Sequence, residues 1–300
     1  MSVFDGIYRR YTGEFKGRLS RIWAISTQSF RVQFSGKKII PLLILCNLPV
    51  ISFTLMIVFI SIFLGGGLTG FLGAFFGSLD EAVYLVISIT FNPAMIFLPI
   101  VFICTLNAGT IANDKKHNSL ALYMARPISR IDYVFGKAIS VYFVSAFASL
   151  IPWLTFLLAF TLLRGVSGAV FFETLWVYLS TIASGIVVIF FIGSIILLFS
   201  SMGSQSVLSG ILAILILFLP SLLSSIVSEW TSNSWIDYFS ISQLITSSVY
   251  LIFGKPTVEM FGIPFLSTDL NGGISLTLML SIGIICILFT INNLYKEEID

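Results

Sequence analysis

The residue types that most often carry chemistry are scarce in this sequence. Histidine occurs once, as His117, and the three cysteines, Cys46, Cys104 and Cys286, lie far apart along the chain. Histidine-dependent metal sites and HExxH proteases need more histidines, and the cysteines lack metal-ligand spacing. The run at 65–67 is glycine-rich, but the sequence contains no GxxxxGK[ST] phosphate-binding loop. We therefore expect no catalytic residue, metal site or bound cofactor in this chain.

The rest of the sequence is dominated by apolar residues. Of the 300 residues, 57% are hydrophobic and 10% are charged, whereas soluble domains average about 25% charged residues. Six windows free of Asp, Glu, Lys and Arg are long enough to cross about 30 Å of hydrocarbon as helices. These windows are 40–64, 86–112, 138–163, 174–199, 206–228 and 272–293. Their continuous apolar character predicts an all-α polytopic membrane protein.

The distribution of basic residues predicts the orientation of these spans. Fourteen of the 16 Lys and Arg residues fall in residues 1–39, in the loop 113–137 and in the C-terminal tail. The positive-inside rule places these segments and both termini on the cytoplasmic side of the cell membrane. We expect residues 1–39 to form a cytoplasmic N-terminal segment and residues 40–300 to form one six-span transmembrane domain.

The N-terminal segment interleaves basic and apolar side chains over residues 15–38. This pattern favours a helix that lies in the cytoplasmic interface against membrane lipid, although a solvated basic tail would also fit. An arm that binds nucleic acid is disfavoured because the adjoining chain is membrane-embedded. The expected interfacial anchors are Arg18, Arg21, Trp23, Lys37 and Lys38.

The extracellular segment 229–271 is too apolar for a plain loop. We expect one or two helices here that enter the membrane partway and return. A full crossing by residues 236–253 is the alternative, but Asp237, Gln243 and a Ser/Thr cluster argue against it.

Three asparagines, Asn47, Asn92 and Asn107, lie inside the predicted spans. They either pair across helices as packing contacts or line a cavity. The spans contain no ionisable residue of the kind that proton-driven pumps use, which disfavours a secondary transporter. Charge-free spans also favour a lipid-linked or amphipathic cargo over a small, highly charged solute.

The loop 112–137 carries the most local structural information. His117-Asn118 is expected to break the preceding helix, since asparagine tolerates positive φ. Ser119 can then cap a short helix that Pro127 ends. The apolar face of that helix, at i, i+3 and i+4, consists of Leu120, Tyr123 and Met124.

The next helix begins with an N-cap pattern, in which Ser129 is followed three residues later by Asp132. The result is a short amphipathic helix that two spans hold crosswise below the membrane. The residues alone leave two interpretations open: the helix docks on a partner protein, or it lies on lipid.

This loop resembles the corresponding loop of ABC-2 type ABC transporter permeases. The matching residues are Ser119-Leu120, Leu122, Ala125-Arg126-Pro127-Ile128-Ser129-Arg130 and Gly136-Lys137. The chain departs from the family at Asn118, where glycine is usual, and in its Asp114-Lys115-Lys116 run, where the family is more acidic. The outline is also similar: an N-terminal interfacial helix, six spans and a long semi-apolar segment before the last span.

The resemblance implies that the chain is the transmembrane subunit of an ATP-driven exporter. Its partners would be a separate nucleotide-binding ATPase, which holds ATP and Mg²⁺, and a second permease, identical or related. Spans one, two and five would line the path. The residues that the resemblance assigns to ATPase coupling are Ser119, Leu120, Leu122, Tyr123, Met124, Arg126, Pro127 and Arg130. The alternatives are a membrane scaffold that anchors a partner and a secondary transporter.

Overall fold

A computed structural model describes most of the chain. The described residues are 17–35, 39–63, 93–124, 128–163, 168–231, 234–254, 257–260, 263–267 and 270–296. They are almost entirely helical, which confirms the predicted all-α class apart from one short β-hairpin.

The first half contains α1 (Arg18–Phe34), α2 (Ile39–Cys46), α3 (Leu48–Phe63), α6 (Pro93–Asn107), α7 (Gly109–Lys116), α8 (Ser119–Met124) and α9 (Arg130–Ala148). The second half contains α10 (Leu150–Leu163), α11 (Gly168–Met202), α12 (Ser206–Thr231), the 3₁₀ helix η1 (Ser234–Phe239), α13 (Ile241–Phe253), β1 (Thr257–Met260), β2 (Ile263–Ser267) and α14 (Gly272–Lys296).

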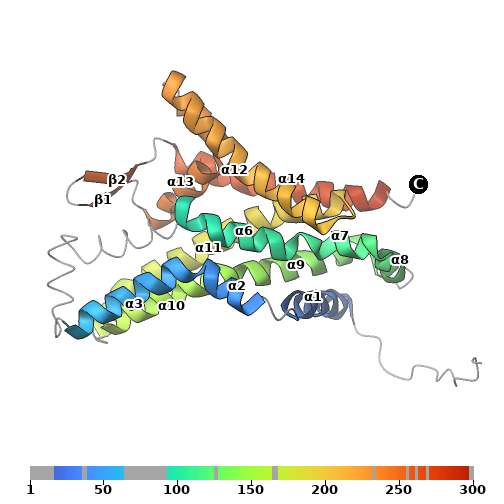
Figure 1. Cartoon of the computed structure of the whole chain (residues 1–300), viewed down its shortest axis with the longest axis horizontal. Coiled ribbons are helices and arrows are strands. Elements are labelled where there is room, and N and C mark those ends of the chain that lie inside the picture. Colours follow the sequence, from blue (N-terminus) through green and yellow to red (C-terminus); the bar gives the residue numbers. More distant parts are fainter. Residues whose placement is uncertain are drawn as a thin grey trace, which may run out of the picture.

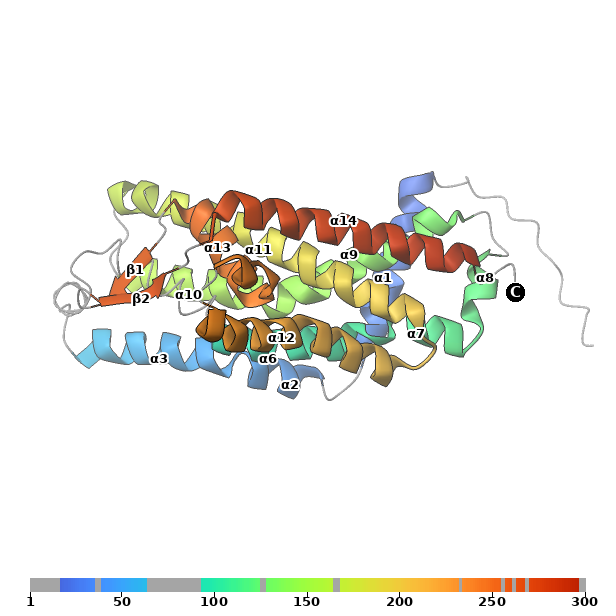
Figure 2. The ribbon, with the colours of Figure 1, turned by 90° about the horizontal axis from the view of Figure 1, so that it is seen from above.

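The long helices run in roughly one direction and form an elongated bundle (Figure 1). α8 and the C-terminal end of α14 lie at one end, here named the α8 end, and the β-hairpin lies at the other. Helix α1 crosses the bundle near the α8 end instead of following its axis (Figure 2). This is the arrangement expected of an interfacial helix beside membrane spans.

Four helices in the described part of the chain are long and apolar enough to cross a membrane. They are Arg130–Ala159, Leu175–Met202, Ser206–Ser228 and Gly272–Lys296, and each overlaps one of the predicted windows. Helices of membrane-spanning length and apolar composition are therefore confirmed in four of the six predicted windows. The predicted windows 40–64 and 86–112 contain shorter helices, α2 with α3 and α6 with α7, and residues 64–92 lie outside the described ranges.

Single residues interrupt these two helix pairs without ending the hydrogen-bond ladder. The N–H of Asn47 donates to the carbonyl of Leu43 (3.2 Å), and the N–H of Ile51 donates to that of Asn47 (2.9 Å). The N–H of Ala108 likewise donates to the carbonyl of Cys104 (2.9 Å). Each pair is thus a connected helical segment that a single residue interrupts.

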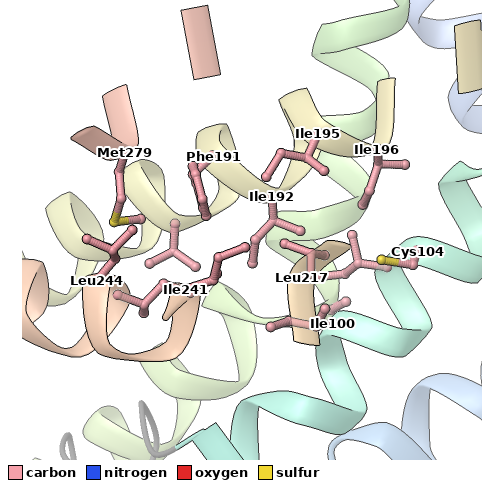
Figure 3. Close-up of a cluster of buried hydrophobic side chains, with 14 of the residues drawn as sticks. Ile100, Cys104, Phe191, Ile192, Ile195, Ile196, Leu217, Ile241, Leu244 and Met279 are labelled. Atoms are coloured by element: carbon pink, nitrogen blue, oxygen red, sulfur yellow. The ribbon is translucent and has the colours of Figure 1, made fainter. Parts of the chain in front are cut away.

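The apolar core lies where α6, α11, α12, α13 and α14 meet (Figure 3). Helix α11 supplies several of its best-buried side chains, including Phe191, Ile192 and Ile196. Apolar side chains also cover the outside of the bundle: on α12, Val207, Leu222 and many residues between them are exposed. A core of this kind with an apolar exterior fits a lipid environment.

Glycines allow the helices to approach closely. An added Cβ at Gly193 on α11 would lie 2.8 Å from the Tyr142 ring of α9, and one at Gly283 on α14 would lie 2.5 Å from the Phe190 ring. Small residues at such contacts let large side chains of the neighbouring helix pack into the space. The hydroxyl of Tyr142 also lies 3.0 Å from that of Ser194. These contacts join α9, α11 and α14 into one unit.

The segment 229–271 forms helical structure followed by a β-hairpin that the sequence analysis did not predict. β1 and β2 are antiparallel, and their register is irregular between Val258 and Glu259. Helix α13 has an N-cap at Ser240, whose hydroxyl accepts from the N–H of Gln243, and ends at Gly254 with φ 75°. At 13 residues, α13 spans only about 20 Å, which is too short for a full crossing.

Candidate functional site

The turn between α7 and α8 has the predicted form. Asn118 adopts φ 53°, the only positive φ of a non-glycine residue in the described ranges. The N–H of His117 donates to the carbonyl of Asn113 and that of Asn118 to the carbonyl of Lys115, both at 3.1 Å. Helix α8 begins directly afterwards at Ser119, whose hydroxyl donates to the carbonyl of Asp114 (3.1 Å). The predicted helix break at His117-Asn118 is confirmed.

The predicted N-cap of the next helix is also confirmed. The hydroxyl of Ser129 accepts a hydrogen bond from the N–H of Asp132 (3.1 Å), and α9 begins at Arg130. The Asp132 carboxylate is buried and accepts from the guanidinium of Arg18 on α1 (2.5 Å). Asp132, in the first turn of α9, therefore interacts favourably with the positive end of the helix dipole. It also binds Arg18 and so holds α1 against α9.

Two residues of the predicted docking face pack against this chain itself. A cluster at the α8 end is formed by seven buried side chains: Ile111, Tyr133, Val134, Ala138, Val141, Leu197 and Leu294. Leu120 and Tyr123 are half-buried and pack against this α8-end cluster. The Tyr123 ring lies 5.4 Å from the Tyr133 ring, centroid to centroid. The sequence analysis did not predict this packing within the chain, and docking of the same face on a partner stays a prediction.

A buried ion pair lies beside this contact. The ammonium of Lys137 on α9 lies 2.6 Å from Oδ2 of Asp114 on α7, and the hydroxyl of Tyr133 donates to the same oxygen (2.7 Å). The side chain of Lys137 is only 6% exposed. Burial of a charge is costly unless a partner and hydrogen bonds compensate for it, as they do here. A lysine at the edge of an apolar window was the sequence signal for this pair.

Helix α1 is held on α9 by a close contact at Gly136. An added Cβ there would lie 2.9 Å from Cβ of Ile25 and 3.1 Å from the carbonyl oxygen of Ile22. The side-chain amide of Gln33 donates to the hydroxyl of Thr110 (2.7 Å), which links the same helix to α7. Gly136 thus contacts α1, and its neighbour Lys137 contacts α7 through Asp114. Both residues belong to the stretch that resembles the permease loop.

The predicted interfacial anchors lie partly on α1. Trp23 is 59% exposed, and its ring contacts that of Phe143 edge-on at 6.1 Å. Arg18 is exposed and Arg21 is half-buried. Lys37 and Lys38 lie outside the described residues. Trp23 and Arg18 are thus both exposed on α1, and Arg18 also pairs with Asp132 of α9.

Of the other predicted coupling residues, Arg130 makes a contact with the last helix. The guanidinium of Arg130 lies over the ring of Tyr295 on α14, 4.2 Å from its centroid. Leu122 and Met124 belong to helix α8. Arg126 and Pro127 lie outside the described residues. Arg130 thus connects the start of α9 to the end of the last helix.

Two of the three asparagines in the predicted spans, Asn47 and Asn107, bond to their own helices. Nδ2 of Asn47 donates to the carbonyl of Leu43, and Nδ2 of Asn107 donates to that of Ile103, both at 2.9 Å. Both residues are buried, and Oδ1 of Asn107 has no hydrogen-bond partner within the described part of the chain. Asn92 lies outside the described residues.

Ser200 on α11 positions the α6–α7 junction. Its hydroxyl accepts from the N–H groups of Ile111 (2.9 Å) and Ala112 (3.2 Å) and donates to the carbonyl of Ala108 (2.7 Å). This fully buried side chain therefore bonds to three backbone groups at the junction. We expect Ser200→Ala to lower the free energy of unfolding by about 1–3 kcal/mol, because buried polar groups lose their partner.

Thermal unfolding in detergent measures this effect. Ser225→Ala is the matched control, since the hydroxyl of Ser225 is exposed and donates only to its own helix, at the carbonyl of Leu222. An equal melting temperature for both variants would show that Ser200 does not hold the junction.

Comparison of the chain with models of known protein families and with curated protein sequences gave no match. Within the described residues, no group of three or more His, Cys, Asp or Glu side chains could hold a metal ion. The arrangement at the α8 end is that of a rigid junction: α1, α7, α8 and α9 meet there through ion pairs, a glycine contact and a small apolar cluster.

Proposed function

We propose that this chain is the permease subunit of an ATP-driven ABC exporter of the ABC-2 type, in the cell membrane, with both termini cytoplasmic. The observation that carries the proposal is the geometry of the α7–α8–α9 connection. A positive-φ break at Asn118 separates a span from a six-residue helix, and a Ser129 N-cap starts the next span. A short helix held at the basic end of a membrane bundle is suited to receive force from a partner protein.

The proposal assigns ATP hydrolysis to a separate ATPase subunit that binds ATP and Mg²⁺. The exposed residues of the α7–α8 turn, Lys116, His117 and Asn118, lie beside α8 and are available to contact this partner. Leu120 and Tyr123 have a positioning role, since they anchor α8 to the chain's own cluster.

The full proposed topology has six spans, with α2–α3 as the first and α6–α7 as the second. The segment 229–271 is re-entrant on the extracellular side. A second permease, identical or related, completes the path against spans one, two and five. The exposed apolar side chains of α3 and α12, such as Leu55, Phe59 and Leu222, support contacts of these helices with lipid or with another permease. The absence of Asp, Glu, Lys and Arg from the six apolar windows of the sequence favours a lipid-linked or amphipathic cargo.

Affinity purification from the native membrane tests the proposal. The expected result is a stoichiometric P-loop ATPase subunit that co-purifies with the chain and hydrolyses ATP in reconstituted vesicles. An accessory scaffold would retain the ATPase without coupling hydrolysis to transport. Absence of any ATPase, together with gradient-driven transport by the purified chain, would reject the proposal in favour of a secondary transporter.

Single-cysteine labelling tests the proposed topology. In a background in which Cys46, Cys104 and Cys286 are replaced, a cysteine at Ser119 should be protected from an impermeant reagent in intact cells and react after the membrane is opened. A cysteine at Trp235, which is 67% exposed at the opposite end, should react in intact cells. The reverse pattern would invert the orientation that the basic residues predict.

A further inference from the structure

We propose that the Asp114–Lys137 ion pair and the two tyrosine rings beside it form a latch that fixes the orientation of α8 on the bundle. The Lys137 ammonium lies 2.6 Å from Oδ2 of Asp114. It also lies 5.5 Å from the ring centroid of Tyr133 and 5.9 Å from that of Tyr123. Three consecutive helices therefore meet at one charge, because Asp114 belongs to α7, Tyr123 to α8, and Tyr133 and Lys137 to α9.

Helix α8 needs such an anchor. It has six residues, and a helix this short has too few hydrogen bonds to maintain itself or its direction. It follows a turn at Asn118 that changes the chain direction within one residue. Its orientation must therefore come from side chains that reach the bundle, and among the described side chains of α8, Leu120 and Tyr123 pack on the α8-end cluster.

The ion pair suits positioning better than it suits stabilisation. The side chains of Lys137 and Asp114 are 6% and 18% exposed, so both ions have lost most of their hydration. Buried pairs of this kind can often be replaced by apolar residues without loss of stability, whereas removal of one partner leaves an uncompensated charge. The pair does, however, set a direction: a cation attracts the face of an aromatic ring, and a carboxylate fixes where the cation lies.

The latch has a consequence for transport that rests on the proposed function. Because Lys137 contacts α7 and α8 as well as its own helix, a displacement of α8 by a partner ATPase is passed to both flanking helices together. Without the latch, α8 would move on its own, and hydrolysis would proceed without movement of the spans.

Labelling of a reporter cysteine tests the latch on the purified chain, without any partner. Ser119→Cys, in a chain lacking the three native cysteines, places a thiol at a half-buried position of α8 and leaves Leu120 and Tyr123 in place. We expect Lys137→Met to lower the melting temperature, and Asp114→Leu with Lys137→Met to recover most of this loss. In both variants the reporter thiol should nevertheless react with a maleimide several times faster than in the parent, because α8 has lost its anchor.

Tyr123→Leu keeps an apolar side chain, removes the ring and should also speed labelling, which provides a readout if Lys137→Met does not fold. Tyr295→Leu is the control, because that ring covers Arg130 elsewhere at the same end and its loss should leave labelling unchanged. Labelling of the double variant and of Tyr123→Leu at the parent rate would overturn the latch. Since the assay contains no ATPase, a failed search for the partner would reject the proposed function and leave this result standing.

Discussion

Replacing Gly136 with alanine is expected to displace α1 from the bundle, and replacing it with leucine is expected to do so more strongly. The added Cβ would lie 2.9 Å from two atoms of Ile25 and 3.1 Å from the backbone oxygen of Ile22. A backbone atom cannot rotate away, so the whole helix must shift. Overpacking of this kind costs about 1–3 kcal/mol, and the shift also disturbs the Arg18–Asp132 pair.

Limited proteolysis and thermal unfolding in detergent measure this displacement. Cleavage within α1 should become faster in Gly136→Ala, and the melting temperature should fall. Gly203→Ala is the matched control, because the nearest atom to an added Cβ there is the Ser209 hydroxyl at 3.7 Å, an ordinary contact. If Gly136→Ala is cleaved and melts like the parent, α1 does not pack on α9 as described.

The sequence predicted best where one residue determines the local backbone. Asn118 tolerates positive φ, and it adopts φ 53°. Ser129 is followed three residues later by Asp132, and its hydroxyl accepts from that N–H group. These features depend on neighbours within a few positions of the chain, and no distant contact is needed to specify them.

The direction in which an amphipathic helix points was not predictable in the same way. Leu120 and Tyr123 share one face by helical spacing, but spacing does not identify what covers that face. The α8-end cluster that covers it combines residues from α7, α9, α11 and α14, so its existence depends on the tertiary fold. The partner of Lys137 was hidden for the same reason, since Asp114 lies on another helix.

Span prediction succeeded for the continuous helices and was less informative at the interruptions. Hydropathy located α11, α12 and α14 because each is a long apolar run. It did not reveal the interruptions at Asn47 and Ala108, across which the hydrogen-bond ladder continues. It also missed the β-hairpin after α13, whose residues include apolar and polar types without a clear alternation.

Leu120→Glu is expected to destabilise the chain itself, in addition to any effect on a partner. Leu120 is half-buried against the α8-end cluster, so the substitution removes an apolar contact and places a carboxylate beside apolar side chains. Loss of a buried leucine and partial burial of an unpaired charge together cost about 2–4 kcal/mol. A face that only docked a partner would give no change in the isolated chain.

The thermal unfolding of the purified chain in detergent separates these two roles, and ATPase binding is measured in parallel. His117→Glu is the control: it adds the same charge three residues earlier, at an exposed position at the end of α7, where a negative charge costs only about 0.3–1 kcal/mol. We expect Leu120→Glu to melt well below this control. If the two variants melt together and Leu120→Glu loses the ATPase, then Leu120 faces the partner directly and the packing of α8 on the α8-end cluster is wrong.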